Sequence, residues 1–154
     1  MKPSILELSQ RPDLVDRAVD FFWKCWGDED NFAFYKDCMV HSLNQEALLP
    51  KFYLALDEVD QIIGTYALLT NDLISRQDLM PWFACLFVVE GHRKKGIAAM
   101  LLDHGLKEAK NKGFENLYLY TDLENFYERK AWKHICNGFT VSNLEVKIYT
   151  RKTT

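Results

Sequence analysis

Six consecutive residues, RKKGIA at positions 93–98, combine the residue types that bind a phosphate ester. Arg93, Lys94 and Lys95 supply charge-assisted donors, and Gly96 lets the backbone approach a ligand without a Cβ atom in the way. The stretch follows an apolar run and opens a helical pattern, and a helix N-terminus aims backbone N–H groups and the positive end of its dipole at one point. The alternative is a solvated basic turn that only caps the helix. The spacing leaves both interpretations open.

Two familiar phosphate-binding motifs are absent from this turn. The pattern G-x-x-x-x-G-K-[ST] does not occur, and Gly91 and Gly96 are too far apart for G-x-G-x-x-G. The formal net charge of -3 and the pI near 5.8 also argue against a nucleic-acid-binding module that would use the HRKK segment at positions 92–95. Any anion site in this chain must therefore be local.

A strand, a helix and a second strand position the basic turn. The continuously apolar run WFACLFVV, positions 82–89, indicates a central strand buried on both faces. The helix that starts at Gly96 carries its apolar residues on one face and ends at Gly113. The segment NLYLYT, positions 116–121, is the next strand, so the three elements form a βαβ unit that we expect to be parallel and right-handed.

The remaining elements complete an α/β fold. The sequence predicts a strand in SILELS (4–9), a helix from Pro12 to Gly27, a second helix from Phe32, a hairpin at 51–70, a polar connection at 71–80, a short helix at 126–130, and strands at 133–139 and 145–150. The predicted order is β-α-α-β-β-β-α-β-α-β-β, a central mixed β-sheet flanked by helices. We expect one domain, residues 1–154, because this length suits a single core.

Composition excludes several classes of protein. The four cysteines, Cys25, Cys38, Cys85 and Cys136, are widely separated and indicate neither a metal site nor a disulfide framework, so we interpret them as buried small hydrophobes. The N-terminus lacks an apolar signal region, and the longest apolar run is far shorter than a membrane helix. We therefore expect a soluble, cytoplasmic protein that uses no metal and does not bind a membrane.

Two segments resemble the GNAT N-acetyltransferase superfamily. RKKGIA is similar to the R/Q-x-x-G-x-G/A signature and lies, as in that superfamily, between a strand and a helix. NFYERKAW, positions 125–132, is similar to the common FYEKxGF/W segment, and the likeness extends over nearly the whole chain. The chain departs at Ala98, where many members have glycine and the motif also allows alanine, and at Ala131, which replaces the usual glycine before the aromatic residue.

The resemblance implies acetyl-CoA as cosubstrate and assigns roles to particular residues. The pyrophosphate would rest on the backbone of residues 93–98. The strand end at 87–89 would splay from the strand at 116–121, hold the pantetheine arm and polarise the acetyl carbonyl, while Tyr127 would act as the general acid for the leaving thiolate. The residues so assigned to the cosubstrate are Phe87, Val88, Val89, Arg93, Lys94, Lys95, Gly96, Ile97 and Ala98.

The general base is left open, because the strand at 82–89 has no carboxylate where some members carry a glutamate. The candidates are Glu90, Asp72, Asp78, His92, His41 and Glu46, whereas His104 and His134 are interpreted as structural. We expect the first two helices, residues 71–80 and the final hairpin to form the acceptor pocket. The acidic balance of the chain favours a cationic acceptor.

Two functions remain as hypotheses. The first is an acetyl-CoA-dependent N-acetyltransferase that acts on a primary amine, in a small molecule or a peptide, by direct attack in a ternary complex. The alternative is a non-catalytic CoA-binding sensor or assembly module. The sequence also allows a homodimer.

Overall fold

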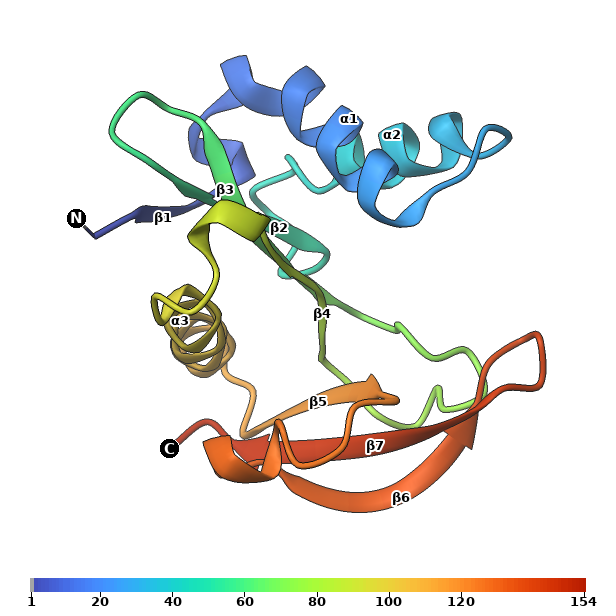
Figure 1. Ribbon diagram of the computed structural model, residues 1–154. Coiled ribbons are helices and arrows are strands. Elements are labelled where there is room, and N and C mark those ends of the chain that lie inside the picture. Colours follow the sequence, from blue (N-terminus) through green and yellow to red (C-terminus); the bar gives the residue numbers. More distant parts are fainter. Residues whose placement is uncertain (1) are drawn as a thin grey trace. The chain divides into compact units, whose positions relative to one another are not determined.

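The computed structural model describes residues 2–154 and confirms the predicted mixed α/β fold (Figure 1). Among these residues there are seven strands and three α-helices, in the predicted order apart from one short helix. The elements are β1 (Ser4–Glu7), α1 (Val15–Trp26), α2 (Phe32–His41), β2 (Lys51–Leu56), β3 (Ile62–Leu69), β4 (Trp82–Val88), α3 (Ile97–Asn111), β5 (Asn116–Thr121), β6 (Lys133–Phe139) and β7 (Glu145–Lys152). The strands follow the order β1-β2-β3-β4-β5-β7-β6 in one sheet.

The chain divides into two compact units. The first unit holds the chain up to Ala67 together with Cys85–Leu101, and the second holds Leu68–Ala84 together with Leu102–Thr154. Neither unit is continuous in sequence. The β3 and β4 strands and the α3 helix each contribute residues to both.

In the first unit, α1 buries the face that the sequence predicts. Leu14, Ala18 and Phe22 are at most 2% exposed, and the Phe22 ring meets the edge of Phe52 on β2 with 5.2 Å between ring centroids. Pro12 begins a single 3-10 turn that leads into the helix, as expected for a residue that lacks an N–H group. β1 pairs antiparallel with β2, and α1 lies beside α2 (Figure 1).

In the second unit, β7 is the middle strand of an antiparallel arrangement. It pairs with β5 along its length and with β6 on its other edge. Leu73, Trp82, Val146 and Ile148 form a buried cluster in this unit. β4 pairs in parallel with β5 at Trp82↔Tyr118, which confirms the parallel crossover.

The predicted short helix at 126–130 is wrong in extent. The structure has a single 3-10 turn there, Glu128–Lys130, because the next residue, Ala131, has φ +65° and its N–H returns to the Glu128 carbonyl. This is the left-handed conformation that glycine adopts most readily. The backbone shape is therefore kept although alanine replaces the glycine common in similar sequences.

A left-handed residue interrupts β4. Cys85 has φ +58°, and its carbonyl accepts a hydrogen bond from the Thr65 hydroxyl at 2.9 Å. A non-glycine residue with positive φ inside a strand is uncommon and indicates a local bulge. The boundary between the two units falls at this residue. Like the other three cysteines, Cys85 is half-buried, not fully buried as expected.

Substitution of Cys85 tests the strain in this bulge. We expect Cys85→Val to lower the free energy of unfolding by ~1–3 kcal/mol, because a β-branched residue is disfavoured at positive φ. Cys85→Gly should change it by less than ~1 kcal/mol, since glycine adopts this backbone freely. Urea unfolding measures both. Cys25→Val, on α1 where φ is not positive, is the control, and an equal loss in both valine variants would contradict the assignment.

Candidate functional site

The start of α3 forms an open cradle of backbone donors. The first helical hydrogen bond runs from the Met100 N–H to the Gly96 carbonyl at 3.1 Å. The N–H groups of Ile97, Ala98 and Ala99 therefore have no hydrogen-bond acceptor within the helix. Gly96 has φ +80°, and no heavy atom lies within 4 Å of the place where a Cβ would stand. An anion can approach this backbone without steric hindrance.

The three cations before Gly96 do not play the same part. The Arg93 Nε donates to the Val88 carbonyl at 2.8 Å, and its guanidinium lies 5.4 Å from the centre of the Phe87 ring. Arg93 therefore ties the turn to the end of β4. Lys94 has φ +62°, and both Lys94 and Lys95 are exposed with no ion-pair partner among the described residues. They are free to contact a ligand.

The end of β4 uses part of its backbone within the protein. The Val89 N–H donates to the Ile63 carbonyl at 2.9 Å, and the Val89 carbonyl accepts the His92 N–H at 2.8 Å. The Val88 carbonyl accepts Arg93 but retains a second lone pair. The expected contact between this strand end and a pantetheine arm stays a prediction, and it must use groups other than the Val89 N–H.

A hollow of about 680 Å³ lies between α1 and the end of β4. Its apolar wall includes Phe21 and Phe87, whose rings meet edge to face at 5.9 Å. Its carboxylates are Asp20, which pairs with Lys24 at 2.8 Å, and Glu90, one of the candidate bases. The volume of this hollow and its mixture of apolar and charged lining residues are typical of a small-molecule site.

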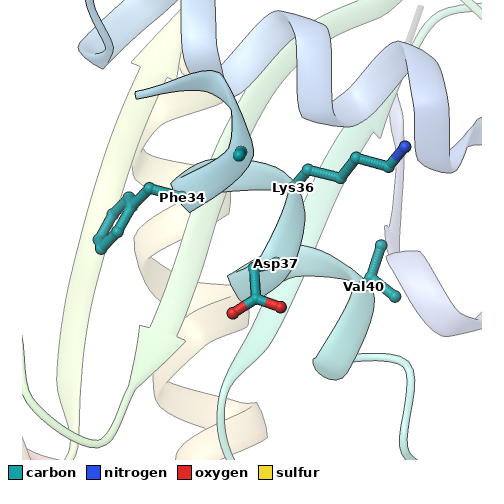
Figure 2. Close-up of a pocket in the computed structure, with 5 residues that line it drawn as sticks. Phe34, Lys36, Asp37 and Val40 are labelled. Atoms are coloured by element: carbon teal, nitrogen blue, oxygen red, sulfur yellow. The ribbon is translucent and has the colours of Figure 1, made fainter. Parts of the chain in front are cut away.

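A second hollow follows the outer face of α2 (Figure 2). Phe34 is 69% exposed and Val40 38% exposed, and Figure 2 shows the Asp37 carboxylate projecting between them. His41, a candidate base, is exposed, and its Nδ1 lies 3.4 Å from the Asp37 carboxylate. The face thus offers apolar surface beside a carboxylate, which suits an aliphatic amine.

Tyr127 lies in the second unit in an aromatic cluster. Its ring packs near those of Phe126, Trp132 and Tyr149, and the residue is only 8% exposed. Burial raises its pKa to about 12, so the phenol is protonated throughout the physiological range. The hydroxyl has no hydrogen-bond partner among the described residues, which leaves it able to donate to a ligand.

Of the candidate bases in the second unit, Asp72 and Asp78 differ sharply. Burial raises the pKa of Asp72 to about 6, and its carboxylate has no partner in the described part of the chain. Arg76 donates two hydrogen bonds to Asp78 and lowers the pKa of that carboxyl. The unpaired Asp72 carboxylate, with its raised pKa, suits a general base better than the Asp78 carboxylate that is paired with Arg76.

The other histidines and Glu46 differ in their surroundings. Burial lowers the pKa of His104 on α3. His134 Nε2 lies 2.6 Å from the Asn137 side-chain oxygen, which agrees with its structural interpretation. Glu46 is exposed in the connection after α2. His92 lies in a further hollow beside α3.

Replacement of Asp72 by asparagine tests whether burial destabilises the ionised form of its carboxyl. A carboxyl whose pKa is raised by folding stabilises the fold below its unfolded pKa of ~4 and loses that contribution as pH rises through about 6. We expect Asp72→Asn to be more stable than wild type by ~1–3 kcal/mol at pH 7–8 and equal to it near pH 4. Asp78→Asn should show no such gain, because its pKa is lowered. Unfolding measured across pH checks both, and a pH-independent difference for Asp72→Asn would contradict the buried carboxylate.

No helix among residues 2–154 is long and apolar enough to cross a membrane. Within the same residues, no group of three or more histidine, cysteine, aspartate or glutamate side chains could hold a metal ion.

The chain is similar in sequence pattern and in fold to known acetyltransferases. The family model of the acetyltransferase (GNAT) family matches residues 13–137. The fold is similar to that of an aminoglycoside 6'-N-acetyltransferase in complex with coenzyme A, with a TM-score of 0.72, 19% identity, and 98% of this chain and 97% of that chain covered. It is also similar to a mutant of the spermidine N-acetyltransferase SpeG from Vibrio cholerae, with a TM-score of 0.69, 14% identity, and 99% and 94% covered.

A third solved structure carries the cosubstrate. This GNAT acetyltransferase from Elizabethkingia anophelis, with acetyl-CoA bound, has a TM-score of 0.56, 19% identity, and 67% of this chain and 76% of that chain covered. No curated protein matches the chain. At these identities the solved structures establish the fold, and the family model extends over both units. The chain belongs to the acetyltransferase (GNAT) family, in which acetyl-CoA is the cosubstrate.

Proposed function

We propose that this chain transfers the acetyl group of acetyl-CoA to a primary amine by direct attack in a ternary complex. The observation that carries the proposal is the open cradle at Gly96, where N–H groups without a helical acceptor and two unpaired lysines adjoin a glycine with open space at its Cβ position. We assign both units to one acetyltransferase domain, residues 1–154, because the family model extends across them.

The cradle binds the pyrophosphate of acetyl-CoA. The N–H groups of Ile97 and Ala98 donate to the phosphate oxygens, and Lys94 and Lys95 neutralise their charge. Phe87, Val88 and Arg93 hold the strand end beside the cradle, and Phe87 lines the hollow that runs along α1.

The reaction forms one C–N bond and breaks one C–S bond. The amine nitrogen attacks the acetyl carbonyl carbon, the thiolate of CoA leaves, and the amine loses a proton to a base. Tyr127 donates a hydrogen bond to the departing sulfur. Its pKa of about 12 exceeds that of a thiol, ~8.5, so Tyr127 stabilises the thiolate mainly by hydrogen bonding and does not transfer its proton fully.

We assign the base to Asp72. A carboxylate with a pKa of about 6 is ionised at neutral pH and is more basic than an ordinary aspartate. An ammonium group must lose its proton before its nitrogen can attack, and the ionised carboxylate can accept that proton. The same negative charge attracts the cationic form of the acceptor. The acidic limb of kcat/KM in the wild type should lie near pH 6 and disappear in Asp72→Asn.

The acceptor is best described as a cationic amine with an apolar body. Asp37 beside Phe34 and Val40 on α2 provides a carboxylate next to apolar surface, whereas the carboxylates of the α1 hollow share it with the cations Arg17, Lys24 and Arg93. Enzymes of similar fold act on aminoglycosides and on spermidine, which are cationic amines. This similarity supports the class of acceptor and does not select one compound.

The test is acetyl-CoA consumption in the presence of an amine panel. Polyamines, aminoglycosides and peptides with free N-termini are offered to the purified chain, and released thiol is measured. We expect turnover with at least one cationic amine and none in Gly96→Glu. If calorimetry showed tight CoA binding while every amine failed, the alternative of a non-catalytic CoA-binding module would replace this proposal.

A further inference from the structure

The segment that carries Tyr127, residues 125–132, has little regular structure to hold it in place. Its regular element is the single 3-10 turn Glu128–Lys130. Asn125 has φ +63° and Ala131 has φ +65°, a left-handed conformation that residues other than glycine disfavour. Residues in such a conformation persist where the surrounding structure holds them. The position of Tyr127 therefore depends on contacts from outside the segment.

Within the segment, Tyr127 is tied to the residues that follow it. Its carbonyl accepts the Lys130 N–H at 3.0 Å and the Trp132 N–H at 3.1 Å. The Arg129 Nε donates to the Asn125 carbonyl at 2.8 Å. These bonds stay inside the segment and do not attach it to the sheet. A contact that fixes the backbone at Lys130 therefore also fixes Tyr127.

The hydroxyl end of Tyr127 is not held by the protein. No residue in the described part of the chain forms a hydrogen bond with it, and the ring packs against Trp132 and Tyr149, with 6.2 and 5.9 Å between ring centroids. The indole N–H of Trp132 is buried and likewise lacks a partner in the residues described. The direction of the Tyr127 hydroxyl is therefore set by ring packing and by the backbone.

Strand β7 supplies two hydrogen bonds to this segment. Tyr149 and Arg151 lie two residues apart on β7 and so point to the same face of the sheet. The Tyr149 hydroxyl donates to Glu128 Oε2 at 2.6 Å, and Arg151 Nη1 donates to the Lys130 carbonyl at 2.8 Å. Figure 1 shows the turn beside the C-terminal end of β7. All of these residues belong to the second unit.

The two bonds constrain the segment differently. Tyr149 binds the end of the Glu128 side chain, and rotatable bonds separate that end from the backbone. Arg151 binds the backbone itself, one residue before the left-handed Ala131, through a charge-assisted donor. Loss of the Tyr149 hydroxyl frees a side chain, whereas loss of Arg151 frees the main chain to which Tyr127 is bonded.

We propose that Arg151 is a positioning residue for Tyr127. By holding the Lys130 carbonyl, Arg151 keeps the turn in the shape that directs the Tyr127 hydroxyl at the departing sulfur of CoA, and it does not itself touch the substrate. This role rests on the proposed function, in which Tyr127 donates a hydrogen bond to the thiolate. It makes kcat depend on a residue of β7 that lies outside the NFYERKAW segment.

Arg151→Gln tests this role because it removes the charged donor. We expect kcat to fall by ~5- to 50-fold and the affinity for acetyl-CoA to change by less than about 2-fold. Arg151→Lys keeps a charged donor and should restore most of the rate, since one hydrogen bond to a carbonyl does not require the guanidinium fork. Lys152→Gln is the matched control: it removes the same charge from the next, exposed residue of β7 and should react at the wild-type rate.

A double-mutant cycle separates positioning from a general effect on the fold. Single-turnover rates are measured with the acceptor that the amine panel identifies. In the Tyr127→Phe background, Arg151→Gln should lower the rate by less than about 2-fold further, because the hydroxyl that Arg151 positions is already absent. If circular dichroism shows that Arg151→Gln is unfolded, Arg151→Met, which keeps the length of the side chain and its packing, takes its place in the cycle.

The outcomes distinguish the positioning role from the proposed function. Additive losses in the cycle, or a wild-type kcat in the folded Arg151 variant, would overturn the role of Arg151 and leave the proposed function intact. A wild-type kcat in Tyr127→Phe, or no turnover with any amine, would instead contradict the proposed function on which that role rests.

Discussion

Gly96→Glu is expected to weaken CoA binding by at least ~100-fold while the protein remains folded. The substitution places a carboxylate in the space that is open at Gly96, directly before the free N–H groups of Ile97 and Ala98. A negative side chain there repels the pyrophosphate and competes for the same donors, and each charge-assisted hydrogen bond lost is worth ~1.5–3 kcal/mol. Calorimetry with CoA measures the effect, and circular dichroism confirms the fold.

Gly113→Glu is the matched control for this change. Gly113 has φ +90° and, like Gly96, no heavy atom near the place of a Cβ, but it lies after the C-terminus of the same helix. The two variants therefore introduce the same charge and a similar backbone strain at opposite ends of α3. CoA affinity should survive in Gly113→Glu. An unchanged affinity in Gly96→Glu would show that the cradle does not bind the pyrophosphate.

Tyr127→Phe is expected to lower kcat by ~10- to 100-fold and to change acetyl-CoA affinity by less than about 2-fold. The substitution keeps the buried ring and removes a hydroxyl that has no partner in the described chain. The loss falls toward the lower end of general-acid effects because the phenol, with a pKa of about 12, stabilises the thiolate without full proton transfer. Single-turnover rates measured across pH test this.

Tyr149→Phe removes the same atom from a neighbouring ring. The Tyr149 hydroxyl already donates to Glu128 Oε2 at 2.6 Å, and that hydrogen bond raises its pKa to about 12. We therefore expect Tyr149→Phe to reduce stability and to leave kcat near the wild-type value. Tyr127 stays protonated below pH ~12 and so does not titrate between pH 6 and 10. The pH-rate profiles of Tyr127→Phe and the wild type should therefore have the same shape in that range. If Tyr127→Phe reacted at the wild-type rate, Tyr127 would only pack in the core and would not assist the leaving thiolate.

The sequence predicts the fold well because most of its signals are local. The apolar run before Arg93 and the helical pattern after Gly96 determine the strand, turn and helix within about 30 residues. The α1 face follows from the spacing of Leu14, Ala18 and Phe22, all of which the structure buries. The proposed role of Tyr127 could be predicted only from the resemblance of its segment to a known family.

The rest depends on contacts between segments that are far apart in the chain. Nothing in WFACLFVV indicates that Cys85 adopts positive φ, because no glycine or break in hydrophobicity accompanies it. The pKa of Asp72 reflects the burial of its carboxyl in the folded chain. Lys2, His92 and Lys95 line one hollow although Lys2 is far from the other two in sequence. Neither spacing nor composition contains that information.

The discontinuity of the two units has a consequence for synthesis on the ribosome. The first unit needs residues up to Leu101, so it cannot be completed when its first 67 residues emerge. Residues 68–84 emerge in between but belong to the second unit, whose other strands, β5 to β7, are made later. This segment includes the apolar residues Leu73 and Trp82, whose cluster partners Val146 and Ile148 are absent until the C-terminal strands are translated. The nascent chain is therefore most exposed to aggregation and to chaperone binding during that interval.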